Sequence, residues 1–231
     1  MKNIVLLISL IISVNNAVAQ HSVARKWNEV LLEAIRNDYA RPTVHARNLH
    51  HTSILMYDSW AAYTKETDTY FLGKRLNNFN CEYQPIVSDT PEEDIETTLS
   101  YAVYRLLSHR FSKSPNASET QSSIDKLFRE LGHNKTFIST NYLGGSAAAL
   151  GNYLGNKMIE YGLQDGANEE NEYVNLYYES VNTPLAPAQP GNPYITDVNR
   201  WQPLTLELFI DQAGNVIPGN TPEFLSPEWG N

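Results

Sequence analysis

Histidine and acidic side chains are the residues of this chain best suited to metal binding or acid–base chemistry. His45, His50 and His51 fall within one predicted helix. On a helix, His45 and His50 project about 140° apart and His50 and His51 about 100° apart, so the three rings do not converge on one ion. His51 and Asp58 share a face near Arg47 and could hold a metal only with a third ligand from elsewhere in the chain. A polar network or solvated face is the favoured interpretation there.

Residues 165–172 (DGANEENE) are a second, oxygen-rich cluster. The spacing does not match an EF-hand loop, in which glycine occupies the sixth position. A solvated acidic turn is therefore favoured over a structural cation such as Ca²⁺. The serines lie in no recognisable nucleophile context, and no Walker loop, GxGxxG or HExxH motif occurs. The single cysteine, Cys81, excludes an internal disulfide and multi-cysteine metal sites. The residues alone thus assign no catalytic, cofactor-binding or metal-binding position.

The elements that would have to position such groups begin after an export signal. Lys2, the apolar residues 4–14 and the small residues 17–19 form a signal-peptide pattern over residues 1–19. The apolar run is too short to span a bilayer stably, and no later stretch is long enough. We therefore expect a secreted or periplasmic protein that is soluble after signal removal.

Residues 20–162 show helical periodicity and predict five helices in an all-α bundle. The predicted ranges are about 22–39, 42–63, 91–113, 117–131 and 141–161. Ser22, Thr90 and Asn116 are expected to cap helices, the last two in capping boxes with Glu93 and Glu119. The second helix is apolar on every side, which predicts a buried central helix. A further polar stripe on that helix predicts buried polar contacts at Arg41, His45, Asn48 and Thr52.

Two glycine features add detail to the bundle. Gly132 is the expected left-handed residue after the fourth helix. Gly144, Ala148, Gly151 and Gly155 form a small-residue stripe in the fifth helix, which predicts close approach by another helix.

Residues 163–231 differ in character from the helical part. They hold eight of the twelve prolines, and ten acids against one base account for nearly all of the chain's net charge of -9. This acidity argues against nucleic-acid binding, which needs a basic surface. Only residues 204–210 and the following turn indicate a hairpin. The many aromatic residues predict an extended segment that packs over helices, because aromatic side chains favour burial.

Several segments resemble exported vanadium-dependent haloperoxidases. Residues 27–36 (WNEVLLEAIR), 40–49 (ARPTVHARNL) and 56–63 (MYDSWAAY) are similar to the opening helices of that family. Residues 165–169 (DGANE), 199–204 (NRWQPL) and 224–230 (FLSPEWG) look like the middle of the same proteins. The resemblance implies an all-helical fold related to type 2 phosphatidic acid phosphatases. It also implies a vanadate cofactor, with which hydrogen peroxide oxidises a halide.

The vanadate-binding motifs of that family do not occur in this chain. They are a Lys and Arg in K-x6-R-P, a Ser-Gly-His, and a later Arg and His. The only Arg-Pro is Arg41-Pro42, with Ala34 where the Lys would stand, and the only Gly-His is Gly132-His133. The resemblance therefore implies no catalytic residue and no cofactor here. It implies the N-terminal part of a longer protein, whose partner is a missing C-terminal helical half.

Three functional hypotheses follow. The first is the scaffold half of a vanadium-dependent haloperoxidase, or of a related acid phosphatase in full-length form. The second is a non-catalytic exported helical protein that binds a partner through its acidic, aromatic segment; self-association is left open. The third and least favoured is a metal-dependent hydrolase that uses His51 and Asp58.

Overall fold

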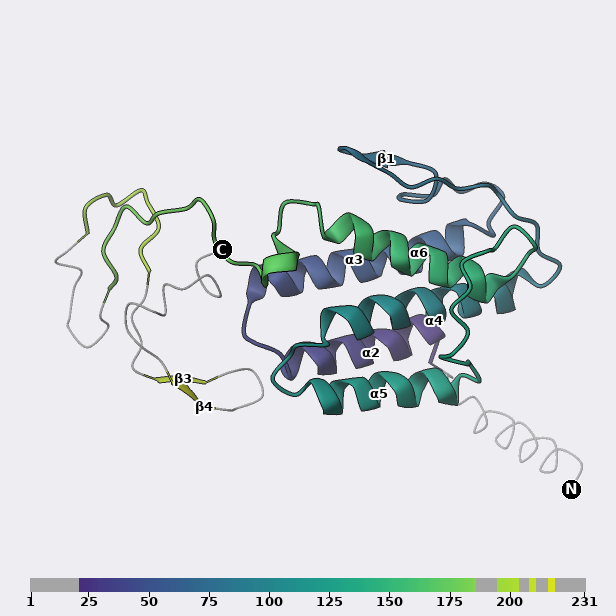
Figure 1. Ribbon diagram of the computed structural model, residues 1–231, viewed down its shortest axis with the longest axis horizontal. Coiled ribbons are helices and arrows are strands. Elements are labelled where there is room, and N and C mark those ends of the chain that lie inside the picture. The colour runs from purple at the N-terminus through teal and green to yellow at the C-terminus, as the bar shows by residue number, and fades with distance from the viewer. Residues whose placement is uncertain (1–20, 186–194, 204–207, 211–215, 219–231) are drawn as a thin grey trace, which may run out of the picture.

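Helices dominate the part of the chain described by the computed structural model, which covers residues 21–185, 195–203, 208–210 and 216–218. Five α-helices lie in these residues: α2 (Val23–Arg36), α3 (Pro42–Ala61), α4 (Pro91–Arg110), α5 (Ala117–Glu130) and α6 (Ala147–Gly162) (Figure 1). The mostly helical character expected from the sequence is confirmed. The predicted signal peptide lies outside the described residues.

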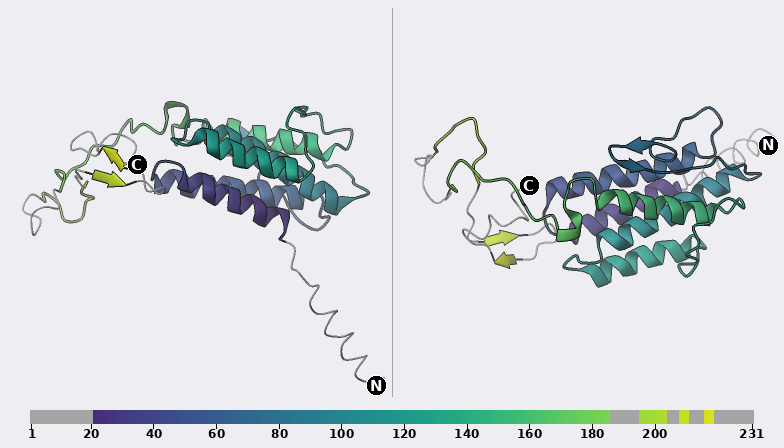
Figure 2. Two further views of the ribbon diagram at one scale, coloured as in Figure 1. Left: turned by 90° about the horizontal axis from the view of Figure 1, so that it is seen from below. Right: turned by 45° about the horizontal axis from the view of Figure 1, so that its top comes forward.

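Helix α4 is the central element of this arrangement. It packs against α2, α3, α5 and α6, and Figure 2 shows α2 and α3 side by side below the other helices. The largest fully buried side chains of the core include Trp27 and Leu31 of α2, Leu106 of α4 and Phe128 of α5. The prediction that the second helix would be central was wrong. Helix α3 is buried on one side only, and Leu49, Tyr57 and Trp60 remain about two-fifths exposed.

Two pairs of short antiparallel strands accompany the helices. Strands β1 (Arg75–Leu76) and β2 (Phe79–Asn80) pair within the connection between α3 and α4. Strands β3 (Leu208–Ile210) and β4 (Val216–Pro218) pair with Phe209 opposite Ile217, which confirms the hairpin expected there. A single 3-10 turn, η1 (Glu169–Asn171), follows α6.

The helix boundaries reflect local signals with two exceptions. Ser22 caps α2, with its Oγ accepting from the Arg25 amide at 3.3 Å. Neither Thr90 nor Asn116 makes the side-chain cap bond that was predicted. At α4 the Ser88 hydroxyl instead accepts from the Thr90 amide at 2.9 Å, the amide that Glu93 would bond in a capping box, and donates to Asp94 at 2.5 Å.

Gly132 has the expected left-handed conformation at the end of α5. Its φ is 82°, its amide donates to the Arg129 carbonyl, and the His133 amide donates to the Phe128 carbonyl. These two bonds form the Schellman motif that closes a helix C-terminus.

The small-residue stripe brings α6 against α4, as predicted. A Cβ at Gly151 would lie 2.4 Å from the Thr98 carbonyl oxygen, and one at Gly155 would lie 2.8 Å from that of Ala102. Helix α6 begins later than expected, at Ala147 with Ser146 as its cap, so Gly144 precedes the helix.

The described residues after Tyr173 extend away from the helices (Figure 1). Asn182 orders this region: it is 1% exposed, its Oδ1 accepts from the amides of Thr196 and Asp197, and its Nδ2 donates to nearby carbonyls. Tyr177, one of the aromatic residues of this segment, is 93% exposed. Tyr194 and the aromatic residues of 219–231 lie outside the described residues. Among the described helices, none has the length and apolarity to cross a membrane.

Candidate functional site

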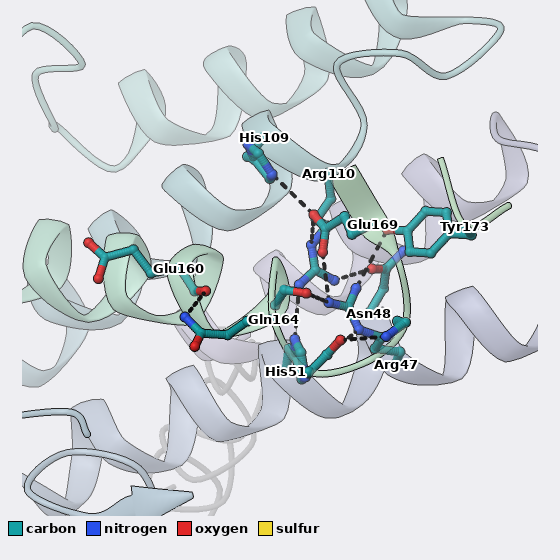
Figure 3. A network of polar contacts seen from close by, with 12 residues as sticks. Arg47, Asn48, His51, His109, Arg110, Glu160, Gln164, Glu169 and Tyr173 are labelled. Atoms are coloured by element: carbon teal, nitrogen blue, oxygen red, sulfur yellow. Dashed lines mark hydrogen bonds and ion pairs between the residues drawn. The ribbon is translucent and has the colours of Figure 1, made fainter. Parts of the chain in front are cut away.

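A buried cluster of charged side chains joins two helices, α3 and α4, to the turn after α6. Arg47, Asn48 and His51 come from α3, and His109 and Arg110 come from the last turn of α4. Asp165, Glu169 and Tyr173 come from the turn that follows Gly162 (Figure 3). The cluster therefore ties together segments that are about 120 residues apart in sequence.

Arg47 holds the turn from the α3 side. Its Nε donates to Asp165 Oδ2 at 2.6 Å, and its Nη2 donates to Glu169 Oε2 at 2.7 Å and to the Gly162 carbonyl at 2.8 Å. Burial lowers the pKa of Arg47, but the two carboxylates outweigh it and hold that pKa above its usual value. The guanidinium is thus fully committed to this segment.

Arg110 approaches the same turn from α4, and its side chain is 1% exposed. Its Nε lies 2.7 Å from Glu169 Oε1, and its Nη1 donates to Asn48 Oδ1 at 2.7 Å. Its Nη2 donates to His51 Nδ1 at 2.9 Å (Figure 3). This last bond requires His51 Nδ1 to be unprotonated, because a guanidinium can only donate.

Electrostatics fix the protonation of Glu169 and His51. Burial raises the pKa of Glu169, but hydrogen bonding to His109 and the charges of Arg110 and Arg47 together lower it to about 2. Burial, followed by the charges of Arg110 and Arg47, lowers the pKa of His51 to about 3. At neutral pH the cluster therefore contains two guanidinium groups, two carboxylates and an uncharged His51.

The turn needs an unusual backbone to bring both carboxylates to the arginines. Asn168, Glu172 and Tyr173 have left-handed φ values of 57°, 57° and 66°. Asp165 Oδ1 also accepts from the Ala167 amide at 3.0 Å, which closes the start of the turn. At Gly162 a Cβ would lie 2.6 Å from Arg110 Nη2 and 2.7 Å from Arg47 Nη2, so only glycine leaves room for both guanidinium groups.

This arrangement fixes the relative positions of α3, α4 and the turn after α6. Each charge faces an opposite charge, and the only histidine buried in the cluster is held by Arg110. Two open cavities of about 310 and 240 Å³ lie beside the cluster, the first lined by Arg47 and Tyr173 and the second by His109 and Glu169. Over the described part of the chain, no three His, Cys, Asp or Glu side chains are placed to bind a metal ion.

The structure separates the residues that the sequence suggested as metal ligands. The buried His45 donates from Nε2 to the Tyr39 carbonyl at 2.6 Å, and His50 is exposed. Asp58 does not join His51: its carboxylate accepts from the amides of residues 70, 71 and 72 at 2.6, 2.8 and 2.6 Å. Burial raises the pKa of Asp58 although these three bonds lower it. Asp58 thus orders the loop after α3.

The favoured interpretation of residues 165–172 was also wrong at two positions. Asp165 and Glu169 are buried beneath arginines, and only the exposed Glu170 and Glu172 fit a solvated acidic turn. The polar contacts predicted at Arg41, His45 and Asn48 are confirmed by their interactions with Asp38, Tyr39 and Arg110. Thr52 is buried, but its Oγ1 has no hydrogen-bond partner among the described residues, so the contact predicted there does not form.

The Arg41-Pro42 and Gly132-His133 pairs have structural roles. Arg41 precedes α3, pairs with Asp38 at 3.6 Å and lies over the Tyr39 ring at 5.0 Å. Gly132 closes α5, and the His133 ring lies 5.1 Å from that of Phe128.

Arg110 and His109 were missed as members of the cluster. Their partners lie 59 to 62 residues away, and no local pattern in the sequence marks either residue as part of a site.

Comparisons of this chain with family models, with curated proteins and with solved structures each found no match.

Proposed function

We propose that this chain is the helical support of an exported vanadium-dependent haloperoxidase and that its own side chains do not bind vanadate. In this proposal the helices form a bundle, the acidic segment packs against further helices, and the vanadate pocket comes from residues outside the described helices. The cofactor expected of a complete protein is vanadate.

The proposal rests on one observation: carboxylates pair with the buried arginines and neutralise them. A vanadate pocket needs several cations that are free to compensate the oxyanion. Arg47 faces Asp165 and Glu169, Arg110 faces Glu169, and Arg41 faces Asp38. A vanadate ion would have to displace these carboxylates at the cost of leaving them buried without partners.

The positions of the resembling segments support the same proposal. Residues 40–49 supply Arg47, residues 165–169 supply Asp165 and Glu169, and residues 56–63 supply Asp58. These are the residues with which the chain joins its helices and loops. Three of the six resembling segments thus supply residues that hold helices and loops together, as a scaffold requires.

A peroxidase assay tests the proposal. The purified chain with orthovanadate, hydrogen peroxide and iodide should form triiodide only at the uncatalysed rate. The whole reading frame that contains codon 231 should be expressed as well. If its product carries the vanadate motifs, it should oxidise iodide only when vanadate is present. Turnover by these 231 residues alone would contradict the support role, and a continuous frame without those motifs would contradict the family assignment.

A non-catalytic exported protein that binds a partner is the second candidate. It is favoured by the exposure of Tyr177 and of Val198, at 93% and 77%. Limited proteolysis separates the two candidates. Rapid cleavage after Gly162 in the isolated chain favours the haloperoxidase support, because residues 163–231 would then lack the helices on which they pack. Resistance to cleavage favours an independent domain.

A further inference from the structure

The outward side of α3 differs from the exposed sides of the other described helices in carrying no charged residue. Its exposed positions are Pro42, Thr43, Ala46, Leu49, His50, Ser53, Tyr57 and Trp60. On α2, by contrast, the exposed positions include Arg25, Glu29, Glu33 and Arg36, and on α5 they include Glu119, Lys126, Arg129 and Glu130. An uncharged stripe on a chain with net charge -9 marks a surface suited to contact with another protein.

Aromatic side chains on this stripe are already held in place. Tyr57 Oη donates to the Asp68 carbonyl at 3.0 Å, and the Tyr57 and Trp60 ring centroids are 5.7 Å apart. Tyr57 is 42% and Trp60 43% exposed. Fixed, half-exposed aromatic residues make efficient contact anchors, because little side-chain entropy is lost on binding.

The residues along the stripe are arranged so that two copies of the stripe can pack against each other. A two-fold axis at Ser53 would place two copies of α3 antiparallel. Each Ala46 then faces Trp60 of the second copy, and each Leu49 faces Tyr57 of the second copy. The large Trp60 thus meets the small Ala46, Leu49 packs against Tyr57, and the small Ser53 lies at the axis, where it allows the two helices to approach closely. A two-fold interface uses the same patch on both subunits in this way.

We propose that the outward side of α3, defined by Ala46, Leu49, Ser53, Tyr57 and Trp60, is the interface of a homodimer. The lack of charge favours a second copy as the occupant, because two chains of net charge -9 repel least where neither presents an acid. A helix pair about 30 Å long buries less than the roughly 800 Å² per subunit of a standard interface. We therefore expect a weak dimer whose population depends on protein concentration. This proposal does not depend on the proposed function.

Sedimentation velocity over a range of concentrations tests the dimer with a matched pair of variants. Leu49→Glu places charge on the stripe, and Leu32→Glu places the same charge on α2 at a similar exposure, 40% against 38%. We expect a concentration-dependent dimer for the natural chain and for Leu32→Glu, and a dissociation constant at least about 100-fold higher for Leu49→Glu. Circular dichroism shows whether each variant folds. A monomeric natural chain, or a dimer unaffected by Leu49→Glu, overturns the proposal.

A cross-linking variant locates the axis independently. Ser53→Cys should form a covalent dimer on mild oxidation, because the two residues face each other across the axis. The natural thiol does not compete, since Cys81 is fully buried and burial raises its pKa to about 12. Leu32→Cys is the control and should remain uncross-linked. Equal cross-linking of both variants, or none at Ser53→Cys, would contradict this interface and point to another occupant of the stripe.

Discussion

At the scale of single residues, Glu169 is the centre of the charged cluster. Its carboxylate meets Arg47, Arg110 and His109, while its neighbour Glu170 is exposed. Such a buried arrangement adds little net stability as a whole, but removing one member leaves an opposite charge buried without compensation. The cluster should therefore be most sensitive to changes that alter charge and preserve shape.

Replacing Glu169 by glutamine tests that sensitivity. Glu169→Gln keeps the side chain's size but leaves two buried arginines with one carboxylate, and should lower the free energy of unfolding by about 3–5 kcal/mol. Glu170→Gln is the matched control and should change it by less than about 0.5 kcal/mol. Urea denaturation followed by circular dichroism measures both. Equal effects of the two changes would show that Glu169 is not the centre of the cluster.

The cluster also predicts a dependence of stability on pH. The pKa of His51 is about 3 in the folded chain against an ordinary 6.5, and that of Glu169 is about 2 against 4.5. Between the folded and unfolded pKa values of each group, the unfolded chain binds more protons than the folded chain. The free energy of unfolding therefore falls as pH decreases. Loss should begin below about pH 6.5 because of His51, and steepen below about pH 4.5 because of Glu169.

Replacement of His51 separates the two contributions. His51→Gln can still accept from Arg110 but cannot titrate, so the decline between pH 6.5 and 4.5 should become shallower. The exposed His50→Gln should keep most of the decline, because His50 contributes less than burial, Arg110 and Arg47 to the lowered pKa of His51. Thermal melts at half-unit pH intervals provide the comparison. A profile unchanged by His51→Gln would mean that another group causes the decline.

At the scale of secondary-structure elements, contact between α4 and α6 depends on the absence of side chains. Gly151→Ala would bring a Cβ to 2.4 Å from the Thr98 backbone and should destabilise the chain by about 1–3 kcal/mol, although alanine favours helix formation. At Gly144 a Cβ meets nothing within 4 Å, so Gly144→Ala should be close to neutral. Urea denaturation again distinguishes them, and a stabilising Gly151→Ala would show that the two helices can separate without cost.

Elements were predictable where their signals are local, and the site was not predictable because its contacts are distant. Ser22, Pro42 and Gly132 mark helix ends through their own backbone preferences, and all three positions were correct. The role of Asp58 depends on a loop that folds back 12 to 14 residues later. Arg47 meets Asp165 across 118 residues, a pairing that neither periodicity nor spacing encodes.

At the scale of the whole molecule, the first prediction concerns export. If residues 1–19 are a signal peptide, the protein recovered from the periplasm or medium should begin at Gln20. Mass spectrometry of the intact secreted chain would show this, with Ala19→Arg as a variant expected to block cleavage. Recovery of a chain that still begins at Met1 would contradict the prediction.

The central claim about the whole molecule is that Arg47 and Arg110 hold its helices to the turn after α6 and do not bind an oxyanion, because carboxylates neutralise them. The most direct measurement is titration of the purified chain with orthovanadate, followed by ⁵¹V NMR, with phosphate as competitor. The account predicts an unchanged free-vanadate signal at every protein concentration. Saturable binding that phosphate displaces, and that is abolished by Arg47→Gln or Arg110→Gln in a folded variant, would contradict it.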